Sequence, residues 1–194
     1  MLNNPINPFE YVSILISIIL GLGMTQLLAS FSDLLYNFRK IKFYWPHTLW
    51  IIFILFLHIQ DWFITYQVKN KWEWNLPELF FVLLYPITLF MVSKMLLPNN
   101  ESEEKQNMKL FYKSQHPIIF FIVSICVLLS VLFNLYFINE SFLEQIPLVI
   151  LFLIVLFLSL RKTHNEIVHN VLAITLVAFS IITTIIEKDI WVIK

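Results

Sequence analysis

Long apolar stretches alternate with short polar connections along this chain. The apolar stretches cover residues 8–35, 48–68, 76–97, 117–138, 142–160 and 164–187. Each is long enough to cross a bilayer core of about 30 Å as an α-helix of roughly 20 residues. No long stretch remains for a soluble domain. The pattern predicts an all-α fold, a bundle of six transmembrane helices that forms a single domain over residues 1–194.

Composition points to the same class of protein. Of the 194 residues, 59% are hydrophobic and 13% are charged, with a mean hydropathy of +0.77, whereas soluble proteins have about 45–50% apolar and about 25% charged residues. We therefore expect an integral membrane protein whose main partner is the lipid bilayer. The net charge of zero offers no basic surface for nucleic acid. Cys126 is the single cysteine, which excludes an internal disulfide and a cysteine metal cluster.

Basic residues are distributed unevenly between the two sides of the predicted bundle. The side with loops 36–47, 98–116 and 161–163 collects nine of the thirteen basic residues: Arg39, Lys40, Lys42, Lys94, Lys105, Lys109, Lys113, Arg161 and Lys162. Because cytoplasmic loops carry the excess of Lys and Arg, this side is expected to face the cytoplasm. Both termini are then expected outside, or in the periplasm of a Gram-negative cell.

The second apolar stretch, 48–68, carries His58, Gln60 and Asp61 near its middle. An ionisable group at that depth costs about 3 kcal/mol or more, so it usually faces the bundle interior and marks an ion or proton path. His58 and Asp61 are three residues apart and share one helix face. The sequence predicts an ion or proton path along this face. The alternative is a hydrogen-bonded His–Asp pair that only fixes packing, with Gln60 bonded to a neighbouring helix.

Four glutamates near the predicted helix starts have a simpler explanation. Glu10, Glu78, Glu144 and Glu166 each follow an Asn, Ser or Thr by three residues. This is the spacing of a capping box, in which the carboxylate accepts a hydrogen bond from a free backbone N–H and meets the positive end of the helix dipole. We expect these four carboxylates to cap helices.

Two further patterns concern helix packing. Small side chains recur every four residues on the first helix and form one stripe, the pattern that lets transmembrane helices approach closely: Ser13, Ser17, Gly21, Thr25 and Ala29. This stripe predicts a homo-oligomer. Pro86 falls at the centre of the third stretch, where it removes a backbone hydrogen bond and predicts a kink.

Four histidines, His47, His116, His164 and His169, are expected at the cytoplasmic edge of the bundle. Imidazole is a natural ligand for transition metals and haem, so His47, His116 and His169 are candidate ligands if they meet. The sequence lacks the spacings H-E-x-x-H, H-x-x-E-H and C-x-x-C-H, and solvated interfacial histidines are the alternative. We expect no cofactor, and we expect a function other than catalysis.

Three phrases in the first half carry a resemblance. They are EYVSIL at 10–15, GLGMTQLL at 21–28 and YWPHTLW at 44–50. Together they resemble an uncharacterised group of small bacterial multi-spanning membrane proteins, up to about Pro98. The resemblance implies a bacterial origin, and with it the inner membrane, and it brings no activity to this chain.

Three functions are compatible with these patterns. The first is an oligomeric channel or transporter-like protein with a proton or cation path at His58 and Asp61. The second is a membrane-embedded sensor or interaction subunit of a stress or phage-defence system, which would bind a cytosolic partner through loops 36–47 and 98–116. The third is an intramembrane haem protein. The sequence favours the first, because the His58–Asp61 face is the main polar feature at depth that capping leaves unexplained.

Overall fold

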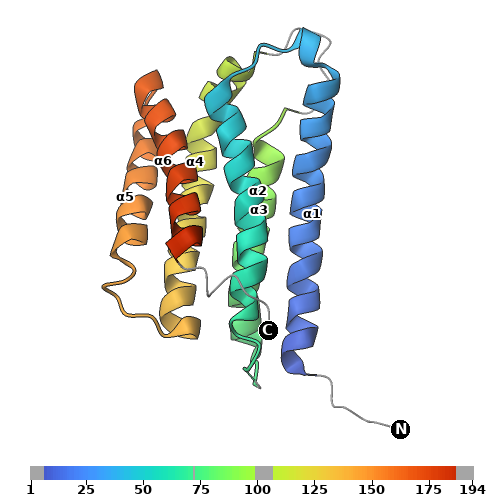
Figure 1. The fold of residues 1–194 in the computed structure, drawn as a ribbon, viewed down its shortest axis with the longest axis vertical. Helices are drawn as coiled ribbons and strands as arrows, with labels where there is room; N and C mark the ends of the chain where they lie inside the picture. Colours follow the sequence, from blue (N-terminus) through green and yellow to red (C-terminus); the bar gives the residue numbers. More distant parts are fainter. Residues whose placement is uncertain (1–6, 72, 99–106, 187–194) are drawn as a thin grey trace.

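A computed structural model of the chain describes residues 7–71, 73–98 and 107–186, which are helical apart from short connections. The α-helices are α1 (Pro8–Tyr36), α2 (Trp45–Tyr66), α3 (Leu76–Met95), α4 (Met108–Phe133), α5 (Ile146–Arg161) and α6 (Glu166–Ile186) (Figure 1). A 3₁₀ turn, η1 (Phe38–Lys40), follows α1, and a π-helical turn, η2 (Asn134–Ile138), follows α4. The all-α fold class is therefore confirmed for the described residues.

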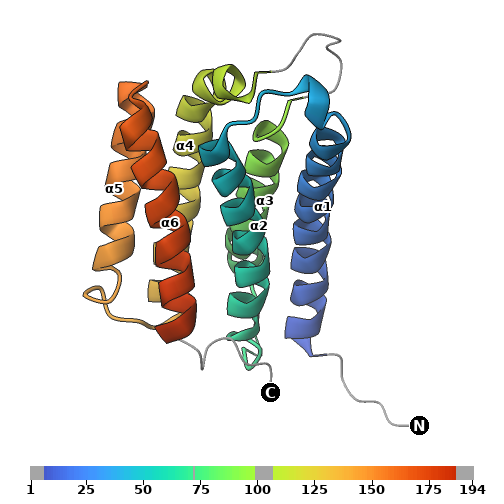
Figure 2. The same cartoon turned by 45° about the horizontal axis from the view of Figure 1, so that its top comes forward.

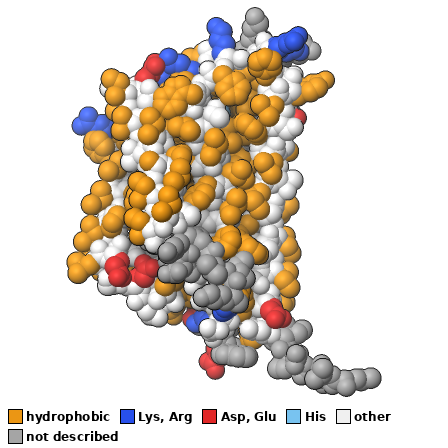
Figure 3. Space-filling model, viewed as in Figure 1, with side chains coloured by type: hydrophobic (Ala, Val, Ile, Leu, Met, Phe, Trp, Pro, Cys, Tyr) orange, Lys and Arg blue, Asp and Glu red, His pale blue; other side chains and the backbone are white. Residues whose placement is uncertain are grey.

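The helices form one bundle in which successive helices run in opposite directions (Figures 1 and 2). α1 packs on α2 and α3, α3 packs on α4, α4 packs on α5, and α2 packs on α6. The bundle end that holds η1 and the starts of α2, α4 and α6 carries most of the cations, and we name it the basic end. Figure 3 shows these cations gathered at the top. The opposite end holds the starts of α1 and α3 and the connection before α5, and we name it the acidic end.

Five helical segments are long and apolar enough to cross a membrane: Pro8–Tyr36, Trp45–Tyr66, Leu76–Met95, Met108–Ile138 and Glu166–Ile186. α5 is also apolar, but its 16 residues reach only about 24 Å at 1.5 Å per residue. The flanks of the bundle are covered by hydrophobic side chains (Figure 3). These features mark the chain as a polytopic membrane protein with five helices of spanning length.

α2 begins three residues before the expected position and α6 two residues after it, and α4 and α5 differ more. α4 begins at Met108 rather than 117, so much of the expected loop 98–116 is helical, and residues 99–106 lie outside the described residues. Asn107 starts this helix, because its side-chain oxygen accepts hydrogen bonds from the backbone N–H groups of Lys109 and Leu110 in the first turn. α5 begins at Ile146 rather than 142, with a proline in its first turn, where the missing N–H costs nothing.

The capping predictions are confirmed in full at α3. There Asn75 accepts a hydrogen bond from the backbone N–H of Glu78 at 2.9 Å, and the Glu78 carboxylate accepts one from the N–H of Asn75 at 3.2 Å. At α1, Asn7 caps the N–H of Phe9 at 3.0 Å, with Glu10 in the first turn. Both helices therefore start where the local sequence predicts.

The other two capping predictions need correction. Glu144 accepts a hydrogen bond from the N–H of Ser141 at 2.8 Å, but this pair lies in the turn before α5 and starts no helix there. Glu166 is not at a third helical position, because α6 begins with it and the preceding Asn165 caps the helix. Its carboxylate instead forms ion pairs with two lysines of α4, at 2.6 Å and 3.3 Å.

Candidate functional site

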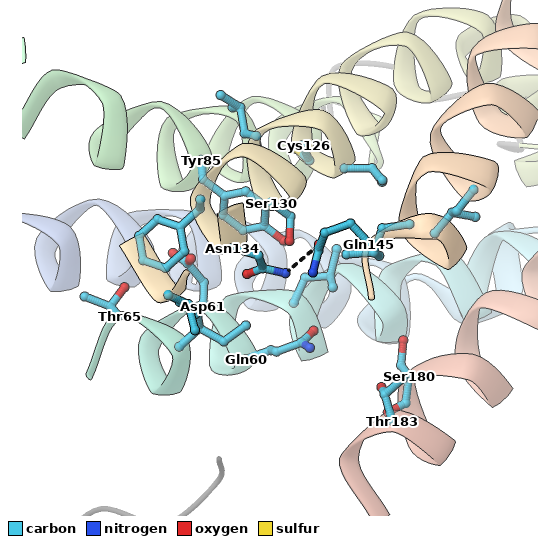
Figure 4. A pocket seen from close by; sticks show the side chains of 18 of the residues that line it. Gln60, Asp61, Thr65, Tyr85, Cys126, Ser130, Asn134, Gln145, Ser180 and Thr183 are labelled. Carbon is cyan, nitrogen blue, oxygen red and sulfur yellow. Dashed lines mark hydrogen bonds between the residues drawn. The ribbon is translucent and has the colours of Figure 1, made fainter. Parts of the chain in front are cut away.

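A cavity of about 290 Å³ lies between α2, α3, α4, α5 and α6. It extends from the middle of the bundle, where Val155 and Leu176 line it, to the connection between α4 and α5 at the acidic end. Ten polar side chains on its wall are labelled in Figure 4: Gln60, Asp61, Thr65, Tyr85, Cys126, Ser130, Asn134, Gln145, Ser180 and Thr183. The remaining wall is mainly aliphatic and aromatic.

Asp61 is the carboxylate set deepest in this cavity. It lies on α2, five residues before the end of the helix, and Figure 4 shows it next to Tyr85 of α3. Its oxygen Oδ2 is buried and has no hydrogen-bond partner in the described part of the chain. A buried carboxylate oxygen without a donor is costly in a protein interior. A proton or cation from outside the chain would therefore offset the free-energy cost of this unpartnered oxygen.

A chain of three polar side chains leads from the acidic end toward Asp61. The Glu140 carboxylate can only accept, so the hydrogen bond between it and Gln145 must use the amide NH₂ of Gln145. The Gln145 carbonyl oxygen is then left to accept from the NH₂ of Asn134, at 3.0 Å. This order turns the Asn134 oxygen Oδ1 away from Gln145, and Figure 4 shows Asn134 between Gln145 and Asp61. Asn134 thus presents a second acceptor oxygen on the side of Asp61.

The described cavity lining contains carboxyl groups and no basic side chain. The carboxyl groups are those of Asp61, Glu140 and Glu144, and no Lys, Arg or His is among the described lining residues. Carboxylates within low-dielectric walls concentrate the field and attract cations. The arrangement can accept a cation and disfavours an anion.

His58 lies in different surroundings from Asp61. It is completely buried between α1 and α3, where its Nδ1–H donates to the carbonyl of Ile54 at 2.8 Å and its Nε2 lies 3.4 Å from the Ser93 hydroxyl. Its ring sits against Gly23 of α1. His58 is absent from the described cavity lining, whereas Gln60 belongs to it. A part for His58 in an ion path stays a prediction.

Three of the histidines meet at the basic end. The ring centroids of His116 and His169 are 4.7 Å apart, and those of His116 and His164 are 5.6 Å apart. Both ring nitrogens of His169 already form hydrogen bonds and are not free to bind a metal. One lies 2.7 Å from the carbonyl oxygen of Thr163, and the other lies 3.0 Å from the hydroxyl of Tyr112. Among the described residues, no group of three or more ligand side chains could hold a metal ion.

His116 and His47 are buried, and each donates a hydrogen bond to a backbone carbonyl. His116 donates from Nδ1 to the carbonyl of Lys113 at 2.9 Å, the group that Pro117 leaves without its helical N–H partner. His47 donates to the carbonyl of Leu96 at the end of α3, at 2.5 Å. Both contacts give these candidate ligands a structural role.

The predicted packing features lie mostly outside the bundle core. On α1 the buried face is formed by other residues, while Thr25 and Ala29 are exposed and a Cβ at Gly21 would meet nothing within 4 Å. A homo-oligomer through this stripe stays a prediction. Pro86 is buried within a continuous α3, and the kink expected there stays a prediction. Loop 36–47 contains η1 and exposed aromatic residues at the basic end, and its part as a docking surface stays a prediction as well.

Sequence reasoning missed most of the cavity wall. Tyr85 comes from α3, Asn134 from η2 and Gln145 from the connection before α5, and nothing in their spacing links them to Asp61. The one available signal was Asn134, a strongly polar side chain inside an otherwise apolar stretch.

The residues and geometry of the cavity are the basis for assigning a function. No family model, no curated protein and no solved structure matches the chain.

Proposed function

We propose that this protein moves a proton or a monovalent cation across a bilayer and that Asp61 is the binding site on the path. The observation that carries the proposal is the buried, unpartnered Oδ2 of Asp61 at the wall of a cavity. Buried ionisable groups within membrane helices are costly and usually serve an ion or proton path. The acidic lining supports a cation as the transported species.

The closed side of the cavity favours a gated transporter over an open pore. Between the cavity and the basic end, the core is filled by large buried side chains that include Trp50, Tyr112 and Phe120. The rings of Trp50 and Phe120 pack against each other with their centroids 5.0 Å apart, and this packed aromatic core supports a closed cytoplasmic side. Pro86 lies beside Tyr85 on α3 and interrupts the backbone hydrogen bonds of that helix, so it provides a place where the wall can move.

The membrane arrangement belongs to the same proposal. α5 serves as a sixth, short span, the basic end faces the cytoplasm, and both termini lie outside. The host membrane is the bacterial inner membrane, and copies of the chain associate through the outward stripe with Gly21, Thr25 and Ala29. The charge separation between the two ends and the open space beside Gly21 support this arrangement.

Flux measurements in liposomes test the proposal. The purified protein is reconstituted, and uptake of protons or K⁺ is followed with fluorescent dyes under an imposed gradient. Asp61→Asn is expected to abolish the flux, because an amide cannot carry the proton or neutralise the cation. Asp33→Asn is the matched control, since Asp33 is an exposed aspartate on α1 away from the cavity. Equal flux in the Asp61→Asn variant would refute the proposal.

A further inference from the structure

We propose that the cavity binds a small amphipathic organic cation, a protonated amine or quaternary ammonium that carries an apolar or aromatic body. The inference rests on the proposed function and names the class of its substrate. Four observations carry it: the volume of the cavity, the position of Asp61, the aromatic wall and the small number of oxygen ligands.

The volume suits a small organic molecule. At about 290 Å³, the cavity is close to the lower end of the range of roughly 300–1,000 Å³ that is usual for ligand pockets. Such pockets are lined mainly by apolar side chains with a few placed polar groups that fix orientation. The cavity has this character, because its polar groups lie toward Asp61 and the acidic end while aliphatic side chains such as Val155 and Leu176 line its inner part.

Aromatic side chains form part of the same cavity wall as Asp61. Six of them belong to the wall: Phe53, Trp74, Phe81, Tyr85, Phe133 and Phe179. The face of an aromatic ring attracts a cation within about 6 Å, and sites for quaternary ammonium groups use such rings. The cationic head is placed beside Asp61 and Tyr85, and the apolar body lies along the aliphatic wall.

A bare divalent metal ion finds too few ligands here. Hard cations such as Ca²⁺ and Mg²⁺ take about six or more oxygen ligands, whereas the carboxylate of Asp61 and Oδ1 of Asn134 are the acceptors that the geometry directs to one place. An ammonium head needs at most three acceptors, and a quaternary head needs none. The two oxygens are therefore enough for an organic cation and insufficient to replace the water shell of a divalent metal ion.

Binding to the full chain in detergent micelles tests the inference. The probe is benzyltrimethylammonium, which combines a quaternary head with one aromatic ring, and its neutral control is neopentylbenzene, which has carbon in place of the charged nitrogen. Titration calorimetry measures both affinities, and KCl is added as a competitor. We expect the cation to bind, the neutral isostere to bind far more weakly, and an equal concentration of K⁺ to leave the affinity unchanged.

Two variants identify the site. Asp61→Asn is expected to weaken binding by about 30-fold or more, the factor that follows from losing one partner of a buried charge pair, and Asp33→Asn is expected to leave it unchanged. Ser130→Lys puts an ammonium group into the cavity, since Ser130 lines it, and is expected to abolish binding. Size-exclusion profiles and helical circular dichroism verify that each variant is folded.

The outcomes separate this inference from the proposed function. Equal binding of the neutral isostere, competition by K⁺ at equal concentration, or unchanged affinity in both cavity variants overturns the organic-cation assignment. If benzyltrimethylammonium does not bind while Asp61-dependent proton or K⁺ flux persists, the inference fails and the proposed function stands. If the probe binds at Asp61 but liposomes show no flux of any of these cations, the site stands and the transport proposal fails.

Discussion

Gly23 is the position at which one added methyl group should disturb the packing of α1. A Cβ built at Gly23 would overlap Nε2 of His58, and it would lie 3.1 Å from Cδ2 of the same ring and 3.4 Å from the backbone Cα of Phe90. The ring cannot simply swing away, because its Nδ1–H is bonded to the carbonyl of Ile54. At Gly21, two residues earlier, an added Cβ meets nothing within 4 Å. The two glycines therefore form a matched pair.

The expected magnitude follows from two opposing effects. Alanine favours a helix over glycine by about 1 kcal/mol, and this gain applies to both positions. At Gly23 the methyl group also overpacks a closed site, which costs typically about 1–3 kcal/mol, and displacing the ring weakens the His58–Ile54 hydrogen bond, worth about 1 kcal/mol. We expect Gly23→Ala to lower the free energy of unfolding by about 1–3 kcal/mol, and Gly21→Ala, which has only the alanine gain, to raise it by about 1 kcal/mol.

Unfolding of the purified protein in mixed micelles by added SDS, followed by helical circular dichroism, measures these changes. The double variant Gly23→Ala with His58→Ala should recover part of the loss, because the smaller side chain makes room for the methyl group, and a double-mutant cycle isolates this coupling. An unfolding midpoint of Gly23→Ala equal to that of Gly21→Ala would show that the close contact between α1 and His58 is wrong.

Two further predictions concern single hydrogen bonds and use the same unfolding assay. Asn75→Ala removes the cap at α3 and is expected to cost about 1 kcal/mol; a change confined within error would contradict the capping box. Ser159→Ala removes the 2.7 Å hydrogen bond from α5 to the carbonyl of Pro117, and a loss of about 0.5–1 kcal/mol is expected for such an interhelical bond; an unchanged midpoint would mean that this bond does not hold α5 on α4.

The membrane character and the six apolar helices could be predicted because both depend on local hydropathy, although five of the six described helical segments, rather than all six, reach spanning length. The Asn75 cap was also predictable, since a capping box is complete within four residues. The ion pairs of Glu166 could not be predicted. Their lysines, Lys109 and Lys113, lie on the first turns of α4, and the polar sequence of this region resembles a loop. Because the region was predicted to be a loop, no contact between its lysines and Glu166 could be expected.

The candidate site also has a part that the sequence predicts and a part that it does not. Asp61 was predictable as a polar residue at depth, but its surroundings were not. Tyr85 and Gln145 join it through the packing of helices that are distant in sequence, and a single sequence carries no signal for such contacts. His58 shares a helix face with Asp61 by spacing, yet the close approach of α1 at Gly23 gives it separate neighbours.

In the proposed arrangement, where α5 crosses the bilayer as a sixth span, its shortness has a consequence for the lipid around it. Figure 1 shows α5 beginning well short of the level that α1 and α4 reach at the acidic end. A helix about 6 Å shorter than the hydrocarbon core draws the headgroups inward, so Glu140 and Glu144 at the mouth of the cavity would meet the polar interface below its usual level. Amphipathic cations concentrate in that interface. The local dimple would deliver them sideways from the leaflet to the cavity, with no need to pass through bulk water.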